Sequence, residues 1–238
     1  MGDLYLHPMS ELLPPINDLI YTRLDLPQPP EIDHEKLTDW IRGNNAHALT
    51  QSQSLYEEKT DKSYPWIAAN IVQQGEFAPF FVESFPEIVD YLKHFPTTKW
   101  RSIVVLSQRQ NRECFLHTDP DLGMGIGWRV YLSHRGPRLY IQKFKERLAE
   151  RPQTWASGGP QAIEELCVPE RIYVNDSGRF AWALTSIRAA HAVEQNPEEL
   201  GSRSVLLLIP EPSCVDYEAT EQMLRRSAEK FSDTAIWF

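Results

Sequence analysis

The sequence predicts a mainly β fold with flanking helices, in which short antiparallel strands form a sandwich or jelly-roll barrel. From Trp100 onward, short runs rich in β-branched and aromatic residues alternate with turn residues, as at 135–137 and 175–178. The chain has 238 residues, 42% hydrophobic and 24% charged, which suits one globular domain. The eight candidate strands are 102–106, 113–117, 128–132, 138–142, 171–175, 180–185, 190–193 and 204–209.

Before these strands the sequence predicts an arm and two helices. Residues 1 to about 30 are rich in proline, which neither a helix nor a central strand sustains, so we expect an irregular arm. Residues 31–41 have the apolar spacing of a short helix. A second helix is expected from Ser84 to about His94, because Ser84 and Glu87 have the spacing of a capping box.

The strand series is interrupted once and is followed by a helix. Residues 143–170 read as a helical insertion, with helices expected at 143–151 and 161–166, and an insertion of this kind is typical of a lid or substrate wall. The amphipathic stretch 217–231 predicts a C-terminal helix.

We therefore expect one domain. Residues 1–99 would form an N-terminal arm and helices that pack on the core, and residues 100–238 would form the jelly-roll core with its insertion and C-terminal helix.

Composition excludes several classes of partner. The net charge of -9 and a pI near 5.3 argue against binding to nucleic acid or to an anionic membrane surface. The three cysteines (Cys114, Cys167 and Cys214) are odd in number and widely spaced, which favours a reducing compartment. The N-terminus lacks the features of a secretory signal, and no apolar run is long enough to cross a bilayer. We expect a soluble, cytoplasmic protein.

Chemistry is concentrated in a His-x-Asp motif, His117 and Asp119, where an apolar run gives way to a glycine-rich turn. Residues two apart on a strand point to the same side, so imidazole and carboxylate can meet one ion. They would supply two ligands of a 2-His-1-carboxylate triad, which leaves positions open on the metal. His191 starts the seventh candidate strand and is the third candidate ligand, and Arg203 heads the eighth.

This order of residues resembles that of the Fe(II)- and 2-oxoglutarate-dependent oxygenase superfamily, whose core is a double-stranded β-helix (jelly-roll, cupin-like). The resemblance covers roughly residues 100–210. It implies that His117, Asp119 and His191 bind iron and are catalytic, and that Arg203 pairs with the distal carboxylate of 2-oxoglutarate.

Within the superfamily, the chain most resembles the aspartyl/asparaginyl β-hydroxylase-like group. In that group, a serine on the first core strand also meets the distal carboxylate, and an arginine soon after the first histidine helps to hold the other end. Ser107 and Arg129 match these positions. Several members of the group lack the carboxylate ligand, whereas Asp119 is present in this chain.

The resemblance implies hydroxylation of an amino-acid residue, free or in a peptide, with Fe(II), 2-oxoglutarate and O2 consumed to give succinate and CO2. A small-molecule substrate is also compatible with it. The aromatic residues that could wall the substrate pocket are Trp128, Tyr131, Tyr140 and Trp182, and Gln142 or Tyr140 could also touch the cosubstrate.

Two other classes of function fit the same residues. One is a cupin-like barrel that uses Zn or Mn for hydrolysis or isomerisation, which would need no partner for a cosubstrate carboxylate. The other is a non-catalytic, small-molecule-binding barrel in which the histidines and Asp119 are structural. The oligomeric state is not encoded in any pattern of this sequence.

Overall fold

A computed structural model of the chain describes residues 16–44, 66–78, 80–108, 113–118, 126–135, 138–149, 152, 160–174, 178–185, 187–196, 201 and 203–238.

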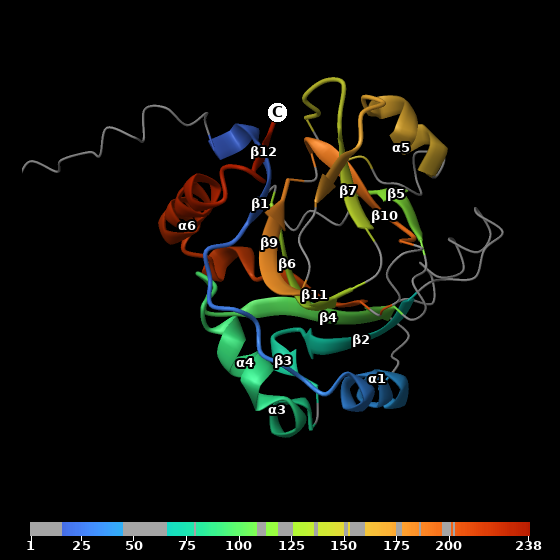
Figure 1. Cartoon of the computed structure of the whole chain (residues 1–238). Helices are drawn as coiled ribbons and strands as arrows, with labels where there is room; N and C mark the ends of the chain where they lie inside the picture. Colours follow the sequence, from blue (N-terminus) through green and yellow to red (C-terminus); the bar gives the residue numbers. More distant parts are fainter. Residues whose placement is uncertain are drawn as a thin grey trace, which may run out of the picture.

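Eight antiparallel strands alternate between two facing sheets. The larger sheet contains the strands in the order β9-β6-β11-β4, and the smaller sheet has the order β5-β10-β7-β8. Counted along the chain, the first, third, sixth and eighth strands lie in one sheet and the others in the second, which defines a double-stranded β-helix (Figure 1). The predicted fold class and all eight predicted strands are confirmed. Their bounds are Trp100–Gln108 (β4), Cys114–His117 (β5), Gly127–His134 (β6), Arg138–Lys143 (β7), Ile172–Val174 (β8), Gly178–Leu184 (β9), Ala189–Glu194 (β10) and Arg203–Pro210 (β11).

Strands from outside this series widen the larger sheet at both edges. β1 (Leu19–Arg23) pairs with β9 and carries the short β12 (Ile236–Trp237) on its other side. β2 (Trp66–Gln73) pairs with β4 and forms a hairpin with β3 (Glu76–Phe77).

The expectation of an irregular arm over residues 1–30 is therefore wrong for residues 19–23. This run contains no proline, and its apolar and β-branched residues fit a sheet edge, with the buried hydroxyl of Thr22 within it.

The helices lie outside the barrel. α1 (His34–Gly43) begins where the Asp33 carboxylate accepts hydrogen bonds from two backbone N–H groups, as a capping residue should. The other helices among the described residues are α3 (Phe81–Ser84), α4 (Pro86–Leu92), α5 (Pro160–Leu166), α6 (Tyr217–Lys230) and the 3-10 turns η2 (Ile16–Asp18) and η4 (Pro212–Cys214).

Two of the predicted helices need correction. The capping box at Ser84 is not formed: Ser84 ends α3, and α4 starts separately at Pro86, whose fixed φ suits a first helical turn. Residues 143–149 are not helical either, because Phe144 bridges to Cys167 and so holds this stretch against the end of the insertion.

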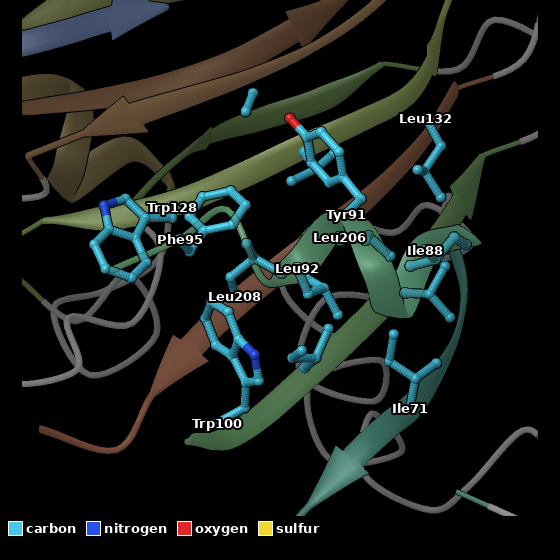
Figure 2. Close-up of a cluster of buried hydrophobic side chains, with 14 of the residues drawn as sticks. Ile71, Ile88, Tyr91, Leu92, Phe95, Trp100, Trp128, Leu132, Leu206 and Leu208 are labelled. Atoms are coloured by element: carbon cyan, nitrogen blue, oxygen red, sulfur yellow. The ribbon is translucent and has the colours of Figure 1, made fainter. Parts of the chain in front are cut away.

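Both faces of the larger sheet are buried, and strand alternation sorts its side chains. Figure 2 shows the outer cluster, where Leu206 and Leu208 of β11 pack with Trp128 and with residues of α4. Val205 of the same strand instead joins the inner cluster, which fills the space between the sheets. The parity of a residue on its strand therefore decides whether it faces the barrel interior.

No helix among the described residues is long and apolar enough to span a bilayer.

Candidate metal and cosubstrate site

Two histidines from neighbouring strands of the smaller sheet face each other. His117 ends β5 and lies directly opposite His191 of β10 in the antiparallel register. Their ring centroids are 4.3 Å apart, with the planes inclined at 48°. The neighbours of His191 at alternate positions, Ala189 and Val193, belong to the inner cluster, so both imidazoles face the barrel interior.

The orientation of the His117 ring is set by its own strand. Its Nδ1 lies 2.8 Å from the carbonyl oxygen of Phe115, which can only accept a hydrogen bond. Nδ1 is therefore a protonated nitrogen, and in the neutral tautomer Nε2 carries the lone pair that a metal would use. A backbone carbonyl is a usual partner for the non-coordinating nitrogen of a ligand histidine.

The third predicted ligand, Asp119, lies outside the described residues. Among the residues that the structure does describe, no group of three or more His, Cys, Asp or Glu side chains could hold an ion. The structure thus brings together two of the three predicted ligands, and the third remains a prediction.

A chain of aromatic rings connects the histidines to Arg203 on the facing sheet. The ring of Trp182 lies edge-on to His191 at 6.0 Å and contacts Tyr131 at 5.7 Å. The Arg203 guanidinium lies 5.7 Å from the centre of the Tyr131 ring, and its Nη1 is 3.5 Å from the Tyr131 hydroxyl oxygen. Arg203 is only 4% exposed. The predicted cosubstrate arginine therefore lies in the interior, two rings away from the histidines.

A second guanidinium, that of Arg129, lies next to Trp182, its partner across β6 and β9. It is 5.9 Å from the centre of the indole and donates a hydrogen bond from Nη1 to the carbonyl of Trp128 at 2.9 Å. A Cβ atom at Gly127 would lie only 2.6 Å from Arg129 Nη1, so a larger residue there would require the guanidinium to shift.

Two guanidinium groups are buried in the described part of the structure, those of Arg129 and Arg203, which are 3% and 4% exposed. A guanidinium binds a carboxylate well in a bidentate manner, so both groups can contact an anionic ligand.

Ser107 does not join this group. On β4, Val104 and Leu106 pack with the inner cluster, whereas Ile103 and Val105 belong to the outer one. Alternation places the side chain of Ser107 with the outer set, on the opposite face of the sheet from Arg203.

Strand alternation also separates the aromatic residues that were expected to line the site into those that face inward and those that face outward. Tyr131 and Trp182 face inward, but Trp128 belongs to the outer cluster, and Tyr140 packs behind the smaller sheet with residues of α5. Gln142 faces the same outer layer, because its side-chain amide donates to the carbonyl of Val168 at 2.9 Å. The expectation that Tyr140 or Gln142 contacts the cosubstrate is therefore wrong.

None of the three cysteines takes part in a disulfide bond. Cys114 and Cys167 are buried, and burial raises the pKa of Cys167 to about 11. Cys114 lies on the inner side of β5, with its Sγ 3.9 Å from His117 Nδ1.

Together, the strand order and the inward-facing residues define a double-stranded β-helix protein with a histidine pair and two buried arginines in its interior. No protein-family model matches the sequence, and no curated protein does either. Among solved structures, the chain is similar to the crystal structure of the non-heme alpha ketoglutarate dependent carbocyclase SnoK from nogalamycin biosynthesis. The two share 12% identity over 91% of each chain, with a TM-score of 0.39. A likeness this distant carries no weight for activity, which has to be inferred from the residues of this chain.

Proposed function

We propose that this protein is an Fe(II)- and 2-oxoglutarate-dependent dioxygenase that hydroxylates an unactivated C–H bond of an amino-acid residue, free or in a peptide. The observation that carries the proposal is the pairing of His117 with His191 inside the barrel, two aromatic rings away from the buried guanidinium of Arg203. Asp119, two residues after His117, would complete the ligand set.

The donor set fits ferrous iron. Two neutral imidazoles and one carboxylate bind Fe(II) while leaving coordination positions open for a cosubstrate and O2. The hydrogen bond from His117 Nδ1 to Phe115 directs Nε2 towards coordination. When bound, the iron would supply the redox chemistry that activates O2. The residues of the protein would hold this ion and orient the other reactants around it.

The two buried arginines fit a dicarboxylate cosubstrate. Arg203 can bind one carboxylate in a bidentate manner, and the Tyr131 hydroxyl, 3.5 Å from its Nη1, can donate a further hydrogen bond to the same group. Arg129, which lies next to Trp182, can hold the other end. The presence of the two buried arginines supports an oxygenase over a Zn or Mn hydrolase or isomerase, which would need no group to bind an anionic cosubstrate.

The overall reaction balances without any further reductant. One atom of O2 enters succinate as 2-oxoglutarate loses CO2, and the other enters the substrate as a hydroxyl group. The protein must hold the target carbon near the histidine pair and keep water away from it. Trp182 is 2% exposed and lies against His191, so its indole shields one side of the pair.

The type of substrate is the least constrained part of the proposal. Aspartyl or asparaginyl β-hydroxylation is favoured by the sequence resemblance, to which Arg129 and Arg203 contribute. Ser107, the third matching residue, faces away from them, so its role in that group does not carry over to this chain.

The proposal is tested in two steps. Anaerobic titration of the protein with Fe(II) and then 2-oxoglutarate should produce a weak visible charge-transfer band, and His191→Ala should abolish it. A screen of amino acids and peptides should then find a substrate that gains one oxygen atom with matching release of succinate. Well-folded protein that binds no 2-oxoglutarate in the presence of metal would refute the proposal.

A further inference from the structure

The insertion between β7 and β8 lies behind the histidine pair. Two backbone hydrogen bonds join the start of the insertion to its end: Lys145 N donates to Leu166 O and Val168 N donates to Lys143 O, both at 2.8 Å. Its helix α5 packs against the outer side of the smaller sheet, beside β5 and β10 (Figure 1). The described part of the insertion is thus a layer on the far side of the sheet from Arg203.

Each histidine is flanked along its strand by residues that contact this layer. Leu116 precedes His117 and packs with Ile163 of α5 in an outer cluster. Ala190 and Ala192, on either side of His191, belong to the same cluster and are 0% and 1% exposed. The small alanine side chains allow the layer to approach β10 closely. Both imidazoles therefore project into the barrel from strands whose outer side packs against the insertion.

The residue that follows His117 makes the most specific contact with the insertion. Thr118 is 5% exposed, and its hydroxyl donates a hydrogen bond to the carbonyl oxygen of Pro152 at 2.6 Å. Pro152 lies 34 residues away in sequence, within the insertion. Thr118 also stands directly between the two predicted ligands of the His-x-Asp motif. The hydrogen bond thus ties the end of β5, from which His117 projects, to the insertion.

We propose that Thr118 is a positioning residue, which uses the carbonyl of Pro152 to hold His117 in register with His191. The insertion is then a support for the metal ligands from outside the barrel. The effect of Thr118 on metal binding rests on the proposed function. Its effect on His117 can be measured without metal.

The test compares Thr118→Val, which removes the hydroxyl but keeps the branched shape, with Thr118→Ser, which keeps the hydroxyl. A matched control is Thr185→Val, because the buried Thr185 hydroxyl also donates to a distant backbone carbonyl, that of Leu19 at 2.7 Å. Co(II) binding, followed by its visible absorption, should weaken about tenfold in Thr118→Val. It should be near the wild-type value in Thr118→Ser and in Thr185→Val.

A second readout uses the metal-free protein. Ring nitrogen NMR should report His117 as the Nδ1-protonated tautomer in the wild type, and Thr118→Val should broaden or shift these signals while those of the exposed His94 stay unchanged. If Thr118→Val folds and leaves both Co(II) affinity and the His117 signals unchanged, the positioning role is wrong. If the wild type binds no metal, the proposed function fails, and the NMR comparison alone decides the role of Thr118.

Discussion

The imidazoles of His117 and His191 lie 4.3 Å apart because the two residues are direct partners across β5 and β10. They are 74 residues apart in the sequence, and the antiparallel pairing of β5 with β10 fixes them opposite each other. An ion between them would therefore meet two ligands held by backbone hydrogen bonds rather than by mobile loops, which favours preorganised binding.

We expect His191→Ala to weaken metal binding by about 100-fold or more, because even partners outside the ligand shell contribute 10- to 100-fold in other metal sites. Anaerobic calorimetry with Fe(II), or with Co(II) as a substitute, measures the affinity. His94→Ala is the control, since His94 is exposed and lies away from the barrel interior on the turn after α4. Equal affinities in both variants would remove His191 from the proposed ligand set.

Arg203→Met should weaken 2-oxoglutarate binding by about 10- to 100-fold, because a charge-assisted hydrogen bond contributes about 1.5–3 kcal/mol. The substitution keeps most of the apolar stem of this buried side chain, and metal affinity without cosubstrate should be unchanged. Binding is measured by titrating 2-oxoglutarate into the metal-loaded protein under anaerobic conditions. Arg101→Met, at an exposed position on β4, should behave as the wild type. Unaltered affinity in Arg203→Met would mean that another group binds the distal carboxylate.

Ser107→Ala should leave the affinity for 2-oxoglutarate unchanged, since Ser107 lies on the outer side of the sheet from Arg203. The substitution should cost at most about 1 kcal/mol of stability. The same titration as for Arg203 measures the affinity, and thermal unfolding measures the stability. A loss of affinity as large as that of Arg203→Met would contradict the strand alternation described for β4.

Acid should destabilise the protein partly through Asp25. The side chain of Lys230 donates a hydrogen bond to the Asp25 carboxylate at 2.5 Å and lowers its pKa below the ordinary 3.8, with Arg226 adding a smaller effect. A lowered pKa in the folded state gives stability above the ordinary pKa, and this stability is lost as the pH falls through the lower value.

In urea unfolding measured across the acid range, Asp25→Asn should therefore lose less stability between neutral and acidic pH than the wild type. Asp233→Asn, which changes an exposed carboxylate, is the control. Parallel stability curves for Asp25→Asn and the wild type would show that the contact between α6 and the residues after β1 contributes nothing to the pH dependence.

Much of the fold could be predicted because turn residues separate the strands clearly. The turn predicted at 175–178 falls between the end of β8 and the start of β9, and the helical pattern at 217–231 matches α6 within one residue. By contrast, β2 was not assigned, since its run Trp66–Gln73 lies in an aromatic-rich stretch with no alternation of polar and apolar residues. Its strand conformation depends on pairing with β4.

Only part of the candidate site could be predicted in the same way. The order of His117, His191 and Arg203 along the chain was readable, because each follows or heads a recognisable apolar run. The contributions of Tyr131 and Trp182 were not separable from those of Trp128 and Tyr140, which have similar composition around them and face the other way.

The sequence alone thus determined the order of the strands and the residue types available for chemistry. The tertiary structure decided which of those residues share a space. The physical reason is that the larger sheet is buried on both faces, so a run such as 205–209 is apolar throughout. The sequence of such a run does not show which of its side chains face the barrel interior. Only the pairing of each strand with its neighbours, and the layers packed on either side, assign Ser107 to one face and Arg203 to the other.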